Sequence, residues 1–154
     1  MRIYLLEREQ VVDKPLEETF EFFSRPENLA RITPSQMGFN ILTPSPINMG
    51  AGTVIDYTIK IAGLDIHWRT LISSYDPPYG FTDEQLKGPY AYWHHRHLFE
   101  KLGKGTRIYD MVSYALPFGI LGSLVHSLFV KRQLNRIFDF RYSAIERILQ
   151  GNEG

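Results

Sequence analysis

The residues of this chain best suited to chemistry are two histidines and one aspartate, His95, His97 and Asp110. Alternate side chains of a strand share a face, so His95 and His97 point the same way, between Trp93 and Phe99. Asp110 belongs to the next predicted strand, beyond a glycine-rich turn. A carboxylate beside an imidazole orients the ring and raises its basicity, as a general base requires. The three residues are therefore candidate catalytic groups for proton abstraction next to a carbonyl.

The same residue types fit two other interpretations. One is a hydrogen-bonded polar cluster that is structural or that orients a ligand. The other is a metal site, which the run His94-His95-x-His97 suggests, although His94 lies on the opposite strand face and would need a bulge to join it. His95, His97 and Asp110 then remain as a three-ligand set. Our prediction is a site without a metal or another cofactor.

Two more polar positions lie on neighbouring predicted strands. Asp83 shares a strand face with Gln85, and because carboxylates at strand ends are commonly exposed, we expect Asp83 to be solvated. Arg69 and Trp68 lie on opposite faces of their strand, and the alternation does not decide which face is inward. An inward Arg69 would pair with a ligand carboxylate. An outward Arg69 would form a cross-strand ion pair instead.

Composition excludes several classes of function. The chain has 154 residues, the size of one domain, and its 17 basic and 17 acidic residues give no net charge, which argues against nucleic acid as a partner. The absence of cysteine excludes disulfides, thiolate nucleophiles and cysteine-based zinc sites. Aromatic residues make up 14%, more than a small core needs, and surplus aromatics often line pockets. The first ten residues contain charges and no long apolar run, so we expect a cytoplasmic protein without a signal peptide.

Periodicity and turn residues predict the order of elements. A first strand over residues 2–12 is followed by two short helices, at 16–24 and 27–32, in which Leu16, Phe20 and Phe23 share an apolar face. Strands separated by tight turns come next. Their predicted ranges are 37–42, 53–61, 66–75, 79–86, 90–101 and 106–116.

A single long helix closes the chain. Pro117, Gly119 and Gly122 mark a break after the last strand, and apolar residues then follow helical spacing to Leu149. Arg141 is expected on the solvent side of this helix, together with the other basic residues. Residues 1–150 form one domain in this interpretation, and residues 151–154 form a frayed tail.

This order predicts an α+β fold. Strands joined by tight turns pair antiparallel, and a sheet of six or seven of them has one face to bury. The C-terminal helix is the only element large enough to cover that face. If the sheet curls round the helix, a space remains between them for a ligand.

The element order resembles the helix-grip fold of the START and birch-pollen-allergen superfamily, also described as SRPBCC or polyketide cyclase/dehydrase-like. The resemblance covers nearly the whole chain, and its opening motif is a strand, a proline, a helix with Phe-x-x-Phe, and then Pro-x-Asn-Leu. The matching residues are Pro15, Phe20, Phe23, Pro26, Asn28 and Leu29. The stretch FTDEQLKGPYAYWHHRHLF, followed by DMVSYALPFG, is similar to a bacterial ligand-binding branch of the superfamily.

The resemblance implies a hydrophobic cavity between the sheet and the long helix, filled by lipids, polyketides, sterols or other apolar molecules. Its members range from carriers to cyclases. The expected function is therefore binding or carriage of a small hydrophobic molecule. Two alternatives stay open. One is an enzyme of the cyclase or dehydratase type that uses His95, His97 and Asp110 as acid–base groups, and the other is a membrane-surface or protein-interaction module whose cavity is vestigial.

Strand alternation and helix phase together predict which side chains face the ligand. The predicted cavity residues are Tyr57, Ile59, Trp93, His95, His97, Phe99, Asp110, Val112, Tyr114, Leu121 and Leu128. The segment Ala115–Val130 is almost uncharged and is followed by Lys131 and Arg132. It is too short and too interrupted to span a bilayer, but such a segment suits contact with an anionic membrane surface. Burial against the sheet, at the cavity mouth, is the other interpretation of this segment.

Overall fold

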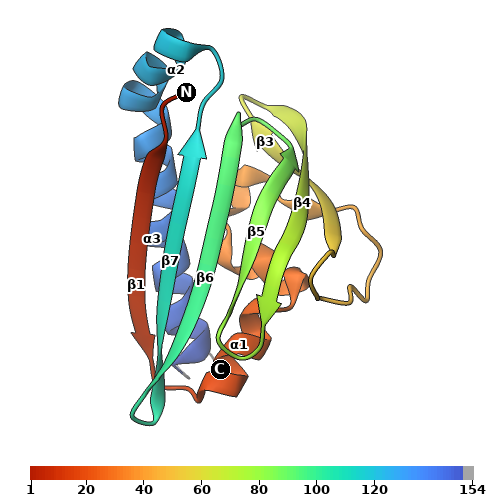
Figure 1. The fold of residues 1–154 in the computed structure, drawn as a ribbon, viewed down its shortest axis with the longest axis vertical. Coiled ribbons are helices and arrows are strands. Elements are labelled where there is room, and N and C mark those ends of the chain that lie inside the picture. Colours follow the sequence, from red (N-terminus) through yellow and green to blue (C-terminus); the bar gives the residue numbers. More distant parts are fainter. Residues whose placement is uncertain (151–154) are drawn as a thin grey trace.

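The computed structural model describes residues 1–150 and confirms the predicted helix-grip fold (Figure 1). Seven antiparallel strands form one sheet in the order β1-β7-β6-β5-β4-β3-β2. The strands are β1 (Tyr4–Val12), β2 (Asn40–Ile41), β3 (Val54–Ile61), β4 (Leu64–Asp76), β5 (Gly80–Lys87), β6 (Tyr92–Leu102) and β7 (Gly105–Ala115). The helical elements are α1 (Leu16–Phe23), η1 (Pro26–Ile32), η2 (Ser35–Met37), α2 (Gly119–Val125), η3 (His126–Val130) and α3 (Lys131–Leu149). The predicted tail, residues 151–154, lies outside the described residues.

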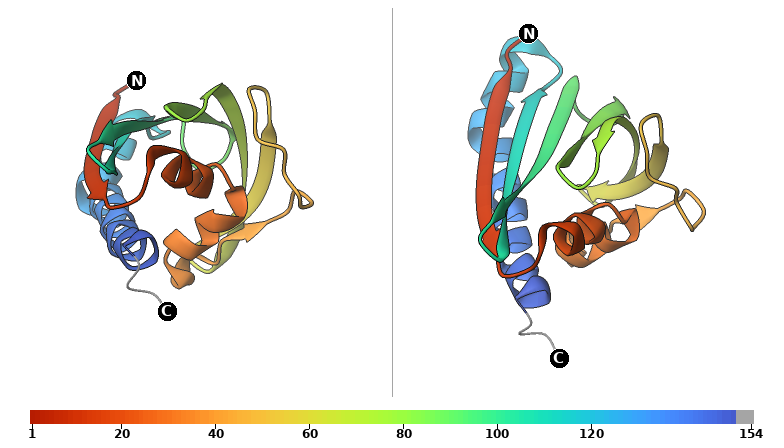
Figure 2. Two further views of the ribbon diagram at one scale, coloured as in Figure 1. Left: turned by 90° about the horizontal axis from the view of Figure 1, so that it is seen from below. Right: turned by 60° about the horizontal axis from the view of Figure 1, so that its bottom comes forward.

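The curvature of the sheet comes largely from β4. This strand is joined to β3 by a two-residue turn in which Ala62 and Gly63 both have positive φ, the backbone that matches the twist of a tight hairpin. Its pairing with β5 is then shifted between Arg69 and Thr70 and again between Ile72 and Ser74. Because bulges bend a strand and increase its twist, β4 and β3 fold over toward the short helices. Figure 2 shows α1 and η1 lying within the curve of the sheet.

The predicted strand over residues 37–42 is mostly wrong. Only Asn40 and Ile41 pair with β3, and the preceding residues form the short helical turn η2, which ends at Gly38 in a left-handed conformation. β2 is an edge strand, and just beyond it the backbone N–H groups of Leu42 and Thr43 both donate to the carbonyl oxygen of Asp56 on β3. The apolar residues of this stretch, Met37 and Phe39, do not alternate along a strand. They pack against the buried cluster that includes Trp68, Trp93 and Phe138.

The C-terminal helix runs without a gap from Gly119 to Leu149, but its turn at η3 is π-helical. The residues that it buries are Gly122, His126, Leu134, Phe138, Ala144, Ile145 and Leu149. Gly122 is required at its position, because a Cβ there would lie 2.2 Å from the carbonyl oxygen of Pro117. Figure 1 shows α3 behind β1 and β7, which is the part of the sheet that it covers.

One end of the space between sheet and helix is filled by α1. The ring of Phe20 lies 5.4 Å from the ring of Phe99 and 5.6 Å from that of Tyr75, and it also meets Phe81 edge-on. The last turns of α3 add Ile145 to the same cluster. The result is a closely packed core at this end of the molecule, built by side chains from both ends of the chain.

Candidate functional site

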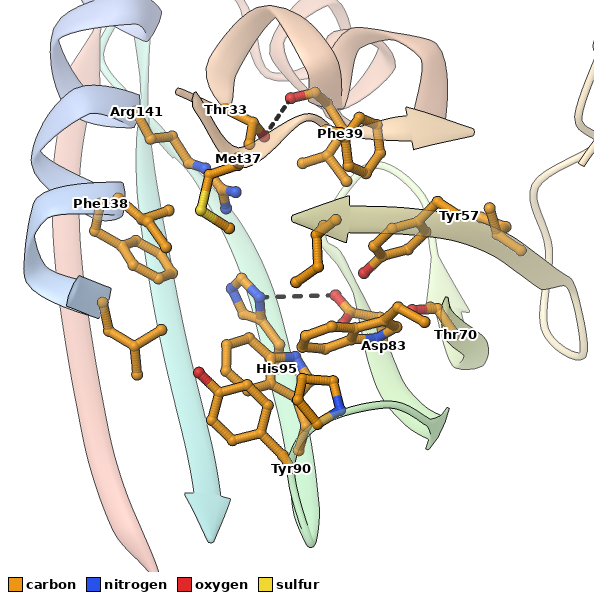
Figure 3. Close-up of a pocket in the computed structure, with 18 of the residues that line it drawn as sticks. Thr33, Met37, Phe39, Tyr57, Thr70, Asp83, Tyr90, His95, Phe138 and Arg141 are labelled. Atoms are coloured by element: carbon orange, nitrogen blue, oxygen red, sulfur yellow. Dashed lines mark hydrogen bonds and ion pairs between the residues drawn. The ribbon is translucent and has the colours of Figure 1, made fainter. Parts of the chain in front are cut away.

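Beyond α1 the space between the sheet and the helix is a cavity of about 500 Å³. Its wall is mostly apolar and aromatic, and all the helical elements and the strands β2 to β6 contribute to it. Both tryptophans of the chain, Trp68 and Trp93, line it. Figure 3 shows this wall, with Tyr57 and Thr70 on the sheet facing Phe138 on the helix.

Two histidines and two aspartates form a polar cluster on the sheet side of the cavity, which we call the His–Asp quartet: Asp83, His95, His97 and Asp110. His95 Nε2 lies 2.7 Å from Asp110 Oδ1, and His97 Nε2 lies 2.5 Å from Asp83 Oδ2. The two imidazole rings stack with their centroids 3.7 Å apart. The pairing is diagonal, since the strand register places Asp83 opposite His95 and Asp110 opposite His97.

The second nitrogen of each imidazole also faces a carboxylate. His95 Nδ1 lies 3.7 Å from Asp83 Oδ2, and His97 Nδ1 lies 3.5 Å from Asp110 Oδ1. A neutral imidazole donates through one nitrogen and accepts through the other, so each ring donates across its short contact. The other nitrogen then carries a lone pair and makes no hydrogen bond with the carboxylate that it faces. That nitrogen is the one that could take a proton from a bound molecule.

Burial and mutual contact set the protonation of the quartet. Burial alone would raise the pKa of Asp83 and of Asp110, but the neighbouring histidines outweigh it and hold the pKa of each carboxyl below its ordinary value. Burial lowers the pKa of His97, the adjacent His95 lowers it further, and the two carboxylates only partly oppose this. His97 is therefore neutral and the carboxylates are ionised near neutral pH.

Arg141 is a charged residue of α3 that faces the cavity. Figure 3 shows its side chain reaching from the helix toward His95. Its guanidinium lies 4.9 Å from the centre of the Phe138 ring, and its Nε atom is buried without a hydrogen-bond partner. Burial lowers the pKa of this guanidinium, and the carboxylates of Asp110 and Asp83 oppose the shift. An arginine keeps its charge even so.

A metal could be held by a different set of residues from the one considered above. Within residues 1–150, Asp83, His95 and His97 each offer a ligand atom, and these atoms lie within 4.8 Å of one another. Two imidazoles and a carboxylate suit Zn²⁺ or a similar transition metal. The imidazoles are stacked and already bonded to carboxylates, so they would have to turn to share one ion.

The structure places most of the predicted cavity residues on the cavity wall. Those that line it are Tyr57, Ile59, Trp93, His95, His97 and Leu121. Asp110, on β7, does not line the cavity but lies behind His95 and accepts a hydrogen bond from its ring. The inward face of β6 is the one predicted, with Trp93, His95 and His97 buried.

Four other predicted residues do not face the cavity. Phe99 belongs to the packed core, because the rings of Phe20 and Phe23 cover it at 5.4 Å. Val112 is fully buried in the cluster that β7 forms with α3, so no space is left beside it. Tyr114 is turned away, because its hydroxyl lies 2.7 Å from His126 Nε2.

Leu128 is the clearest correction, since it is 54% exposed on the outer side of the helix. The apolar residues of this segment predict that the side bearing Leu128 is buried. The helix instead buries the side bearing Gly122 and His126, neither of which is an apolar side chain. The π-helical turn at η3 also shifts the phase of the residues that follow it.

Sequence reasoning missed two residues of the site. Asp83 was expected to be solvated, but β5 pairs with β6 so that its carboxylate meets His97. Asp83 lies two residues after Phe81, a core residue, so strand alternation places both side chains on the same inward face. That spacing could have predicted the position of Asp83. Arg141 was assigned to the solvent side, yet it lies three residues after Phe138, on the buried face.

The uncertainty about β4 is resolved. Trp68, Thr70 and Ile72 point inward, and Arg69 points outward. Arg69 Nε donates to Asp56 Oδ1 at 2.9 Å, and His67 lies 2.7 Å from the same carboxylate oxygen. The cross-strand ion pair is therefore the correct interpretation of Arg69.

The α2 end of the cavity is rich in exposed apolar side chains. Phe118 is 80% exposed, Ile120 91% and Phe129 66%. Phe118 also lines the cavity, so the cavity reaches the surface beside α2. Among residues 1–150, no helix is long and apolar enough to cross a membrane.

Comparison with known proteins gives the fold but no close relative. No family model matches the chain, and no curated protein matches it at a significant level. A solved structure of the Thermus thermophilus protein TTHA0849 superposes with a TM-score of 0.76 at 16% identity, covering 98% of this chain and 100% of that one.

Two other solved structures carry names that bear on the fold. Ara h 8.0201 superposes with a TM-score of 0.62 at 18% identity, over 92% of this chain and 97% of that one. The ZhuI aromatase/cyclase of Streptomyces sp. R1128 superposes with a TM-score of 0.68 at 14% identity, over 96% of each chain. These likenesses show that the chain has the helix-grip fold that its sequence resemblance predicted.

Proposed function

We propose that this protein binds or carries a small hydrophobic molecule in the cavity between its sheet and its C-terminal helix. The observation that carries the proposal is the cavity itself, about 500 Å³ with a mostly apolar wall. Protein interiors are normally filled to the density of organic crystals, and ligand sites are the usual exception. An interaction module with a vestigial cavity would have filled this space.

Both tryptophans line the cavity, so intrinsic fluorescence reports directly on its occupancy. We expect the neutral apolar probe 1-N-phenylnaphthylamine to quench tryptophan emission saturably and with a stoichiometry of about one. A probe that binds only at the surface would quench weakly and without saturation, which would contradict the proposal.

Two adjacent residues of β4 provide a matched pair of variants. Thr70 is buried and lines the cavity, whereas Leu71 points to the opposite face. Thr70→Phe places a ring in the cavity and should weaken probe binding at least about tenfold, equal to about 1.4 kcal/mol. Leu71→Phe adds a ring to the same strand outside the cavity and should leave binding unchanged. Equal effects of the two variants would argue against the cavity as the site.

A second candidate function is acid–base catalysis, which the 2.7 Å contact between His95 and Asp110 favours. One fold neighbour is an aromatase/cyclase. His95 lines the cavity, and Asp110 orients its ring from behind. In this candidate His95 removes a proton next to a carbonyl of the bound molecule. The test is hydrogen–deuterium exchange at that carbon in a bound ketone, which His95→Gln should abolish without preventing binding.

We also propose that the α2 end of the protein contacts the surface of an anionic lipid bilayer. The sequence has no acidic residue between Asp110 and Asp139, and Lys131 and Arg132 follow the exposed apolar segment. Apolar side chains beside basic residues suit the surface of an anionic bilayer. A cavity that reaches the surface here would open toward the lipid.

Vesicle co-sedimentation tests this contact. We expect binding to vesicles of phosphatidylcholine with phosphatidylglycerol, and much weaker binding to phosphatidylcholine alone. Ile120→Asp should remove it, whereas Tyr79→Asp, an exposed position on the β4–β5 turn, should not. Equal sedimentation of the two variants would contradict the assignment of α2 as the contact surface.

A further inference from the structure

Two side chains that line the cavity each carry a buried donor with no hydrogen-bond partner among residues 1–150. The acceptors nearest the cavity, Asp83 and Asp110, are each bonded to a histidine. Arg141, in contrast, makes no hydrogen bond or ion pair with any of residues 1–150, and its Nε atom is buried without a partner. The other arginine of the cavity wall, Arg25, is paired with Glu21.

A second donor on the opposite wall is also unmatched. Trp68 is only 6% exposed and lines the cavity, yet its Nε1 atom has no acceptor. The neighbouring Thr70 Oγ1 makes no hydrogen bond of normal geometry, although the Tyr57 hydroxyl lies near it. Two residues that line the same cavity, Arg141 on α3 and Trp68 on β4, therefore carry unpaired donors.

Buried donors without acceptors cost free energy, and native proteins leave few of them. A ligand oxygen that accepts from these donors recovers that cost. A carboxylate is the acceptor best matched to a guanidinium, because its two oxygens accept in parallel from the planar fork. The apolar remainder of the wall fits a hydrocarbon tail or ring system.

We propose that the occupant of the cavity is an amphipathic carboxylic acid, with its carboxylate on Arg141 and its apolar part along the aromatic wall. This rests on the proposed binding function and narrows it to one class of ligand. It also makes Arg141 a specificity-determining residue, which would distinguish an acid from an alcohol of the same length.

The test is displacement of 1-N-phenylnaphthylamine by decanoate and by 1-decanol, a pair that differs only in the polar end. We expect decanoate to bind about tenfold more tightly than 1-decanol at pH 7.5, the difference that a charge-assisted hydrogen bond supplies. Equal affinities, or tighter binding of the alcohol, would overturn the carboxylate assignment while leaving the proposed function intact. Failure of the probe itself to bind would overturn both.

Variants of Arg141 locate the effect. Arg141→Gln should remove the preference for decanoate, and Arg141→Lys should retain part of it. Arg136→Gln removes a charge from an exposed position of the same helix and should change nothing. An unchanged preference in a folded Arg141→Gln protein would overturn the assignment.

The comparison of decanoate with 1-decanol gives an independent answer if Arg141→Gln does not fold, because it is made on the unaltered protein.

Discussion

The two ends of the space between sheet and helix differ in what fills them. At the α1 end, Phe20 projects into the curve of the sheet and meets Phe81 and Phe99, so the interior is solid. Toward the α2 end the side chains line the space without filling it, and the cavity remains. The helix there buries a glycine and a histidine while its apolar side chains face out.

The packed end thus supplies stability, and the hollow end carries the proposed ligand site. The packed end contains the first helix and the last turns of the chain, and it supplies the dense contacts that hold the fold. The hollow end forgoes such contacts, and it carries the quartet, Arg141 and the exposed apolar segment. A site that must admit a ligand gives up stabilising contacts, and the packed end compensates for that loss.

The largest expected effect comes from truncating one side chain at each end. Phe20→Ala should lower the free energy of unfolding by about 3–5 kcal/mol, because it empties a filled site. Ile59→Ala, on the cavity wall, should cost about 2 kcal/mol, because one side of Ile59 already lacks neighbours. Urea unfolding measures both. Equal losses would mean that the two ends are packed alike.

Enlarging a side chain should give the opposite ranking. Ala144 is fully buried at the packed end, so Ala144→Leu should destabilise the protein by about 1–3 kcal/mol through overpacking. Thr70→Leu extends into the cavity and should change the free energy of unfolding by less than about 0.5 kcal/mol. A large loss in Thr70→Leu would show that the cavity has no room.

Acid should destabilise the protein in two stages through the quartet. The pKa of His97 is lower in the folded state, so the unfolded chain binds more protons and stability falls as the pH drops below about 6.5. The pKa values of Asp83 and Asp110 are also lowered, so a second loss follows as the pH falls below about 3.8. Urea unfolding between pH 8 and pH 3 measures both stages. In His97→Gln the first stage should vanish, and its persistence would assign it elsewhere.

The smallest effect concerns local opening. α2 buries only Gly122, whereas α1 buries Leu16, Thr19 and Phe20. Amides of α2 should therefore exchange with solvent about tenfold faster than those of α1, equal to about 1.4 kcal/mol of opening free energy. Addition of anionic vesicles should slow the exchange in α2. Equal protection of the two helices without lipid would contradict the difference between the ends.

Much of the fold was predictable because period-2 and period-3.6 patterns report which face of an element is buried. The inward face of β6 followed from alternation, and so did the antiparallel order of the hairpins. Prediction failed where the buried residue carried no apolar signal. The buried face of the C-terminal helix includes Gly122 and His126, which an apolar pattern does not mark as buried. The prediction that Leu128 faces the cavity is wrong for that reason.

Local periodicity was enough to define the antiparallel strands, the closing helix and the histidine-bearing strand face. The tertiary structure alone determines which charged side chains are in contact. The diagonal pairing of His97 with Asp83 depends on the register between β5 and β6, and the unpaired state of Arg141 depends on how far α3 stands from the sheet. Contacts between distant residues depend on register and on the distance between layers, and no local pattern encodes either quantity.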